Sequence, residues 1–381
     1  MSSSTDAPAQ PKKEVRVVGD IPVVQGPPPE PETDSEHEND HENDPDPEPE
    51  LELAKSEEER DDDIDGIEEL MCAFPDDETH LDLMHLRLNS TKHLNLARFA
   101  KTLQVVVLRQ NAITTMRGKD LGALPNLKDL DLYDNLIEHI SGLEHATQLE
   151  VLDLSFNNIR HVSRVAQLSN LHTLYLVQNK IARIRPSDFL GPIAHSLKSI
   201  ELGGNRLRSL ENIGMLTNLE ELWVGKNKIS SFDGIQSLTK LRILSIQSNR
   251  LTSLDGLQTL TNLEELYVSH NGIESLKGLE NNAKLTTLDV SANRIANLDG
   301  IQHFSSLEQL WANDNQIQEI NNLADYIGPQ LMPKLETVYL EGNPLQRVAG
   351  ASYRRKMQLI LPQITQLDAT SNFSAGIVYD T

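Results

Sequence analysis

Apolar residues recur at a fixed spacing through most of the chain. From about residue 80, units of the form L-x-x-L-x-L-x-x-N-x-I/L follow one another, as in LEVLDLSFNNI at 149–159 and LEELYVSHNGI at 263–273. Most units start 22 residues after the previous one. Apolar residues two apart share one face of a strand, so each unit predicts one short strand. The units start at Leu83, Leu103, Leu127, Leu149, Leu171, Leu197, Leu219, Leu241, Leu263, Leu285, Leu307 and Leu335.

The remaining positions of each unit predict a stacked array. The asparagine of the motif recurs from Asn111 to Asn343, and its amide can bond backbone groups where the strand turns into the loop. The rest of the unit predicts a turn and a helical or 3₁₀ segment on the opposite side. Because no unit can bury its own leucines, neighbouring units must stack. This leucine-rich-repeat signature predicts an α/β fold, a horseshoe-shaped solenoid of about twelve repeats with a concave parallel β-sheet and terminal caps.

Departures from the period divide the chain. The intervals from Leu103, Leu171 and Leu307 are longer, at 24, 26 and 28 residues, and suit extra loop or helix on the convex face. Residues 76–102 degrade the motif, with Thr91 at the asparagine position, and predict an N-terminal cap with a first degenerate repeat. Regular repeats then run over 103–345. The segment 346–381 begins with amphipathic helical character and predicts a C-terminal cap and tail.

The net charge of −23 is concentrated near the start of the chain. Between Glu30 and Leu70 there are 21 acids and two bases. Residues 1–75 cannot bury enough apolar surface to offset their ordering entropy and predict a disordered acidic tail. The acidity argues against nucleic acid as a partner. The absence of an apolar leader or of a run of 18 apolar residues argues against secretion and a membrane span, and the single Cys72 indicates a reducing compartment.

The sequence shows no assembled catalytic site. It contains no phosphate-binding loop, no G-x-S-x-G and no C-x-x-C motif. His37 and His41 lie among carboxylates, where metal capture is one reading, and incidental histidines in an acidic tail are the favoured one. Ser35, followed by acids, is a candidate phosphorylation site. We therefore predict a protein that is not an enzyme and that holds no metal or cofactor.

One column of residues is the candidate binding surface. In each strand, the residue between the second and third apolar positions projects from the centre of the concave sheet. Five of the twelve residues in this central column are Tyr or Trp and four are acids, although only 4% of the chain is aromatic. The central column is Arg87, Val107, Asp131, Asp153, Tyr175, Glu201, Trp223, Ser245, Tyr267, Asp289, Trp311 and Tyr339.

Two interpretations of the central column are open. Aromatic residues favour strands, and stacked side chains shield one another. Alternatively, the column is a protein-binding stripe, because Trp and Tyr dominate interface hot spots and the acids suit a basic partner. The flanking columns carry mainly Glu, Thr, Ser, Gln and Asn, which favours the second interpretation.

Several segments resemble a known family. LYLVQNKI, NLEELWVGKNKI, LEELYVSHNGIESLKGLENNAKL, LETVYLEGNPLQ and YRRKMQLILPQITQLDAT are similar to the leucine-rich-repeat regulatory subunit of protein phosphatase 1 (regulatory subunit 7 family), over about residues 76–370. The resemblance implies binding of the phosphatase catalytic subunit through the concave face. Tyr175 and Trp223 stand where the family often has phenylalanine, and Gln309 stands where it has an acid. The expected partner-binding residues are Asp131, Asp153, Tyr175, Glu201, Trp223, Tyr267, Asp289, Gln309, Trp311 and Tyr339.

The resemblance also implies a biological setting. It implies control of the phosphatase's activity, maturation or localisation, a nuclear and cytoplasmic location, and a role in mitotic chromosome segregation. A ternary complex with a small phosphatase inhibitor is a further implication, and we expect a monomer when no partner is present. The alternative is a leucine-rich-repeat scaffold of a cytoskeletal or ciliary complex.

Overall fold

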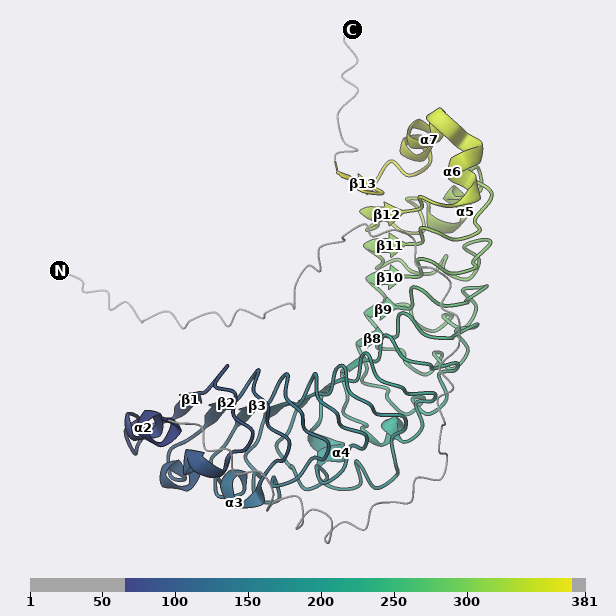
Figure 1. Cartoon of the computed structure of the whole chain (residues 1–381). Coiled ribbons are helices and arrows are strands. Elements are labelled where there is room, and N and C mark those ends of the chain that lie inside the picture. Colours follow the sequence, from purple (N-terminus) through teal and green to yellow (C-terminus); the bar gives the residue numbers. More distant parts are fainter. Residues whose placement is uncertain (1–65, 372–381) are drawn as a thin grey trace, which may run out of the picture. The chain divides into compact units, whose positions relative to one another are not determined.

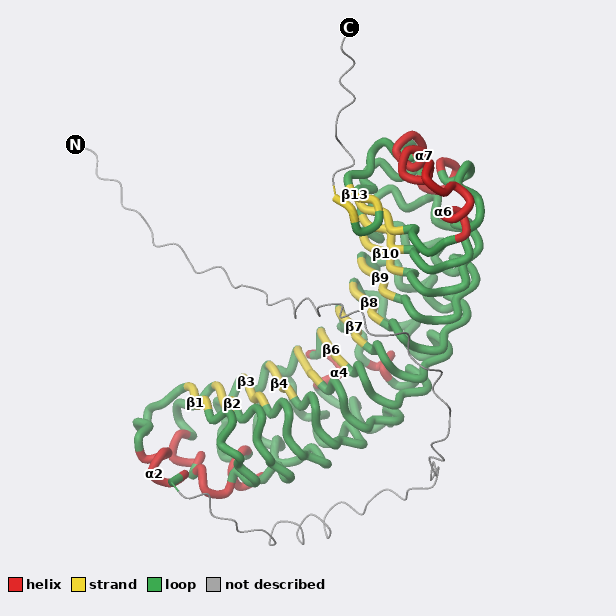
Figure 2. Tube along the Cα trace, turned by 45° about the horizontal axis from the view of Figure 1, so that its top comes forward, coloured by secondary structure: helices red, strands yellow, loops and turns green. Residues whose placement is uncertain are grey.

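The structure is a computed structural model that describes residues 66–371. Its coils stack into a curved solenoid with one short strand per coil, and the strands line the inner side of the curve (Figures 1 and 2). Within the described residues, the strands form one sheet in chain order. Pairing is parallel from β1 to β13, and only the last pair is antiparallel. The predicted horseshoe solenoid with a concave parallel sheet is confirmed. The strands are β1 His80–Asp82, β2 Val105–Val107, β3 Asp129–Asp131, β4 Val151–Asp153, β5 Thr173–Tyr175, β6 Ser199–Glu201, β7 Glu221–Trp223, β8 Ile243–Ser245, β9 Glu265–Tyr267, β10 Thr287–Asp289, β11 Gln309–Trp311, β12 Thr337–Tyr339, β13 Gln366–Leu367 and β14 Thr370–Ser371.

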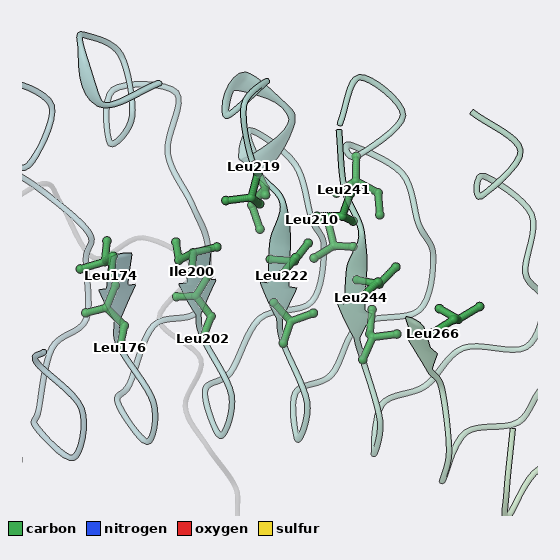
Figure 3. Packing of buried hydrophobic residues seen from close by; sticks show 14 of the residues in the cluster. Leu174, Leu176, Ile200, Leu202, Leu210, Leu219, Leu222, Leu241, Leu244 and Leu266 are labelled. Atoms are coloured by element: carbon green, nitrogen blue, oxygen red, sulfur yellow. The ribbon is translucent and has the colours of Figure 1, made fainter. Parts of the chain in front are cut away.

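The core lies between the strands and the convex segments. The middle residue of each strand from β1 to β12 is fully buried and aligned with its neighbour, as Leu222 pairs with Leu244 and Leu244 with Leu266. Figure 3 shows these leucines pointing into the same interior from successive strands. Each fully buried leucine contributes about 1.5–3 kcal/mol. A coil therefore gains its stability only when a neighbour covers it.

The motif asparagines form the predicted ladder. Asn227 is typical: its Oδ1 accepts a hydrogen bond from the amide of Leu207 at 2.9 Å. Its Nδ2 donates to the carbonyl oxygens of Leu202 in the preceding coil and Val224 in its own, at 3.0 and 3.1 Å. The same arrangement recurs from Asn111 to Asn343. These amides satisfy backbone groups that the turns would otherwise leave buried and unpaired.

The convex side is built mainly of turns, with short helices where coils are long. Most 22-residue coils return through turns, because they have few residues beyond those needed to cross the solenoid. The three long intervals, by contrast, each hold one α-helix, as their extra length predicted. These are α3 Gly118–Leu121, α4 Ile193–Ser196 and α5 Ala324–Ile327, and a 3₁₀ helix, η3 Ile213–Met215, lies in another coil.

The first coil differs from the predicted register. Leu81 pairs with Val106 and Asp82 with Val107, so the strand lies five residues before the one predicted from Leu83. Asp82 thus occupies the place in the central column that was predicted for Arg87, which instead lies in the following loop at a φ of 60°. Thr91 is likewise not at the asparagine position.

The N-terminal edge is covered by helices. These are α2 Ile67–Cys72, η1 Lys92–Leu94 and η2 Leu96–Phe99. α2 falls within the segment 1–75 that was predicted to be a tail, and it buries Ile67 and Met71. Arg98 fixes it by donating from Nη1 to the carbonyl oxygen of Met71 at 3.1 Å. The covering structure therefore includes α2 in addition to the predicted cap at 76–102.

The other end is covered by a helical segment that begins at Pro344, two residues before the predicted 346–381 cap. It comprises α6 Pro344–Ala349, η4 Gly350–Ser352 and α7 Tyr353–Ile360. Leu345, Tyr353 and Met357 are buried against the last coil. Beyond the last ladder asparagine, Asp368 pairs backbone groups at the end of β12, because its Oδ1 accepts from the amides of Leu340 and Glu341 at 2.9 and 3.0 Å.

Some predictions fall on residues that the structure does not describe. The predicted tail up to residue 65, with Ser35, His37 and His41, lies outside the described residues. Among residues 66–371, no helix has the length and apolar character needed to cross a membrane. The same residues contain no group of three or more His, Cys, Asp or Glu placed to hold a metal ion.

Candidate partner-binding surface on the concave sheet

The central column is continuous along the concave sheet. Parallel pairing places each member directly beside the next, from Val107 on β2 to Tyr339 on β12. Neighbouring strands are about 4.8 Å apart, so the ten intervals between these strands cover about 48 Å. The surface divides into an acidic part on β3 to β6 and an aromatic part on β7 to β12.

The aromatic part is a run of rings in contact. Trp223 and Tyr267 stack with centroids 6.3 Å apart and planes inclined by 21°. Tyr267 lies 6.3 Å from Trp311, and Trp311 lies 6.3 Å from Tyr339 in an edge-on arrangement. Pairs of this kind contribute about 0.5–1.5 kcal/mol beyond the area they bury. The four rings form one apolar ridge, which we call the aromatic ridge.

The ridge covers the small residues between its members. Trp223 and Tyr267 are two strands apart and close over Ser245, which is only 2% exposed. Tyr267 and Trp311 similarly cover Asp289, which is 8% exposed and accepts a hydrogen bond from the amide of Ser291 at 3.0 Å. The rings therefore shield Ser245 and Asp289, as the first interpretation expects. Shielding does not exclude a second role in binding. All four rings remain partly exposed on the concave face of the sheet.

The indole N–H of Trp311 faces away from solvent. Its indole Nε1 is buried and has no hydrogen-bond partner. An unpaired buried donor costs about 1–3 kcal/mol. Phenylalanine at this position would cover Asp289 without burying a donor.

The acidic part holds carboxylates in unfavourable surroundings. Burial, followed by the nearby carboxylates of Asp153 and Glu221, raises the pKa of Glu201 from 4.5 to about 7. Burial also raises the pKa of Asp131 to about 6, against the lowering effect of a hydrogen bond from the amide of Tyr133. The pKa values of Asp129 and Asp153 are raised for the same principal reason. A cationic group placed here would stabilise the ionised carboxylates and lower these pKa values.

The acids differ in how far the chain itself satisfies them. Asp131 and Asp153 share Arg109, whose Nε lies 3.1 Å from Asp131 Oδ2 and whose Nη2 lies 3.9 Å from Asp153 Oδ2. Asp153 also accepts from the amide of Ser155 at 2.9 Å. In the described residues Glu201 forms no ion pair. Glu201 is therefore the acid with most to gain from an external cation.

Tyr175 and Gln309 extend the surface. Tyr175 lies between Asp153 and Glu201 in the register of the sheet, and burial followed by these carboxylates raises the pKa of its hydroxyl. Gln309 is two residues before Trp311 and so lies on the same face of β11. The structure brings all ten expected residues onto one face, although Asp289 is covered.

An aromatic cluster beside the acidic part was missed by sequence reasoning. The Arg109 guanidinium lies over the Tyr133 ring at 4.4 Å, and Tyr133 lies 4.9 Å from the Phe156 ring, which is 42% exposed. These residues follow the strands. Arg109 and Tyr133 stand two residues before their motif asparagines, whereas Phe156 stands one residue before Asn157. Reading one position at a time could not bring them together.

Comparison with known proteins supports the repeat fold directly. A family model described as leucine rich repeat matches residues 101–159. Another, described as leucine rich repeats (2 copies), matches residues 195–237, 239–281 and 261–303. The chain therefore contains leucine-rich repeats over these stretches.

Similar proteins are matched over short stretches. The chain is 44% identical over 73 residues to "Protein phosphatase 1 regulatory subunit SDS22" of Saccharomyces cerevisiae, covering 19% of this chain and 21% of that protein. It is 62% identical over 39 residues to the protein of the same name in Schizosaccharomyces pombe, covering 10% and 12%. It is 49% identical over 51 residues to "Protein phosphatase 1 regulatory subunit 7" of Xenopus tropicalis, covering 13% and 14%. The matches thus span about a fifth or less of these relatives.

Solved structures share the architecture. An internalin from Listeria monocytogenes superposes with a TM-score of 0.62 at 21% identity, covering 81% of this chain and 95% of that one. A leucine-rich-repeat protein from Leptospira interrogans superposes with a TM-score of 0.55 at 26% identity, covering 71% and 73%. The likeness to the internalin concerns the fold alone.

Proposed function

We propose that this protein is a non-enzymatic regulatory subunit that binds the catalytic subunit of protein phosphatase 1 through its concave face. The observation that carries the proposal is the central column, in which acids with raised pKa values adjoin a partly exposed aromatic ridge. The names of the partly matching relatives support a phosphatase as the partner.

The geometry suits a folded partner with a basic patch beside an apolar one. Trp223 and Trp311 are four strands apart, or about 19 Å, which lies within one standard interface. Glu201 is on the strand next to Trp223, so a cation bound there would lie beside the ridge. Anchoring by the rings would determine the dissociation rate, and the acids would accelerate association with a basic surface.

Direct titration tests this proposal. Purified phosphatase catalytic subunit is titrated into the full chain by calorimetry at about 50 and 300 mM salt. We expect saturable one-to-one binding that weakens at the higher salt. Lysozyme, a basic protein of unrelated shape, is the control for charge alone and should not saturate. An absence of binding, or equal binding of lysozyme, would reject the proposal.

A parallel pull-down separates this function from the alternative scaffold. Recovery of tubulin or dynein without the phosphatase would favour a cytoskeletal or ciliary complex. Assays of activity and metal content on the bound catalytic subunit then distinguish inhibition from maturation. A small phosphatase inhibitor, added to the preformed pair, tests for a ternary complex.

The proposal extends to the cell. A partner of a phosphatase that acts in mitosis would be found in the nucleus and the cytoplasm, and its loss would disturb chromosome segregation. Fluorescent tagging, with imaging of dividing cells after depletion, measures both. Chromosome segregation that proceeds normally without the protein would remove the mitotic part.

A further inference from the structure

A second surface, opposite in charge to the groove, follows the strands on one edge of the solenoid. After each strand the chain passes the ladder asparagine, and the next residue donates its amide to the preceding coil. The amides of Lys180, Arg206, Lys228 and Arg250 donate in this way to Ile159, Ile181, Leu207 and Ile229, at 2.8–2.9 Å. These hydrogen bonds place the four residues in line, about 4.8 Å apart.

Bases also occupy the positions around this line. In the five coils that contain Asn157, Asn179, Asn205, Asn227 and Asn249, we consider the residues one before and one, three and four after the asparagine. Eight of these twenty residues are Lys or Arg and none is Asp or Glu. We call the eight the basic strip: Arg160, Lys180, Arg183, Arg206, Arg208, Lys226, Lys228 and Arg250. Six of them are exposed, and Lys180 and Lys228 are half-buried.

The backbone hydrogen bond at the aligned position does not require a charged side chain. The coils before the strip have Ala112 and Leu136 at the aligned position, and those after it have Gly272 and Gln316, all with the same backbone hydrogen bond. Like charges placed side by side on neighbouring coils repel one another. A solvated edge with no further role would be expected to mix signs, as the later coils do with Glu274, Arg294 and Glu319 in the same positions.

We propose that the basic strip binds an extended acidic segment of a partner polypeptide. The five coils extend over about 19 Å, which an extended chain covers with about six residues. Arginine forks and lysine ammonium groups at this spacing can bond successive carboxylates. The twenty positions contain one exposed aromatic side chain, Phe156, at the end of the strip. A surface that follows a single-stranded nucleic acid normally interleaves such rings for base stacking, so the composition favours a peptide.

The strip is separate from the concave groove and does not rest on the proposed phosphatase function. Two chemically distinct surfaces, one acidic and aromatic and one basic, allow the solenoid to hold two polypeptides at once. The partner bound by the strip would then be brought close to whatever occupies the groove.

The test measures binding of the full-length chain to a fluorescent ten-residue peptide of alternating Glu and Asp. Fluorescence anisotropy of the peptide reports the binding. The variant Lys180→Gln/Arg206→Gln/Arg250→Gln removes three charges from the line. Its matched control, Lys240→Gln/Lys284→Gln/Lys334→Gln, removes the same net charge elsewhere. Each of these lysines directly precedes the first leucine of a unit, and Lys240 and Lys284 contact Asn218 and Asn262 away from the strip. Circular dichroism and urea midpoints verify that both variants fold.

We expect the wild-type chain to bind the acidic peptide and not a Ser/Gly peptide of equal length. The strip variant should lose at least tenfold in affinity and the control less than twofold. Both variants should keep their affinity for the phosphatase, so failure here and failure of the proposed function are distinguishable. Undetectable peptide binding, or equal losses in the two variants, would overturn the proposal. Tighter strip-dependent binding of a single-stranded oligonucleotide of equal charge would overturn it in favour of nucleic acid.

Discussion

Ionised Glu201 should lower the stability of the fold and strengthen binding of the phosphatase, so removing its charge should change the two in opposite directions. Its pKa is raised from 4.5 to about 7 by burial and by the neighbouring carboxylates. At pH 8 the folded protein holds this carboxyl ionised although its surroundings favour the protonated form. The unfolded chain, where the pKa is ordinary, has no such cost. Ionised Glu201 therefore destabilises the fold at pH 8, and stability should rise as the pH falls through about 7 towards 4.5.

The magnitude follows from the pKa difference. A rise from 4.5 to about 7 corresponds to about 3 kcal/mol of preference for the protonated form. Because Glu201 is only half-buried, solvent screening reduces this to about 1–2 kcal/mol. Glu201→Gln keeps the shape and removes the charge. It should thus stabilise the protein by about 1–2 kcal/mol at pH 8, and most of this gain should be lost at pH 5.

Urea unfolding at pH 8 and pH 5 measures the effect. A chain of this size has a urea dependence near 3 kcal/mol/M, so the midpoint at pH 8 should rise by about 0.3–0.6 M. Glu264→Gln is the matched control, because Arg242 bonds the Glu264 carboxylate at 2.6 Å and lowers its pKa. That variant should show no gain at pH 8. A loss of stability in Glu201→Gln at pH 8, or an equal shift at both pH values, would refute the reasoning.

Three further outcomes follow from the same structure. Asn227→Ala should lower the free energy of unfolding in urea by about 2–4 kcal/mol, because it leaves buried backbone groups unpaired. Asn218→Ala removes two exposed bonds, of 2.7 and 2.6 Å, and should cost less than about 1 kcal/mol. Affinity for the phosphatase should rise about tenfold or more between pH 6 and pH 8, because Glu201 and Asp131 ionise over this range. Calorimetry should detect the release of protons on binding. An affinity that does not change with pH would exclude these acids from the interface. Deleting 344–381 should expose the last coil and produce aggregation in size-exclusion chromatography, and a monomeric variant of equal stability would contradict the capping role.

The repeat fold could be predicted because its physics is local. A leucine at every second strand position and an asparagine three residues later fix the strand and the turn, and stacking follows. The prediction was wrong in the first coil because HLDLMHLRLNST offers two leucine registers. The structure uses the earlier one, in which Leu86 takes the asparagine position. The Oδ1 of Asn111 in the next coil accepts hydrogen bonds from the backbone amides of Leu86 and Leu88 at 3.1 and 3.0 Å. No residue in that segment encodes this choice by itself.

The composition of the binding surface could also be predicted, but not its contacts. The alternation of buried and exposed positions along each strand was enough to place the rings and the acids on one face of the sheet. The closure of Tyr267 over Ser245 and Asp289 depends on side-chain rotamers across two strands, and these are set only by packing. The sharing of Arg109 between Asp131 and Asp153 is similar, because it joins three coils. Such contacts decide which acids are available to a partner, and they required the structure.

The aromatic ridge is, in our proposal, the anchor for the phosphatase. Calorimetric affinity of Trp311→Ala and Trp223→Ala for the catalytic subunit tests it most directly, with Ser245→Ala, covered beneath the ridge, as the control. The account predicts a loss of about 2 kcal/mol or more, or about thirtyfold, in each tryptophan variant, and near-neutral behaviour for the control. Circular dichroism must show each variant folded. Wild-type affinity in both folded tryptophan variants would contradict the account.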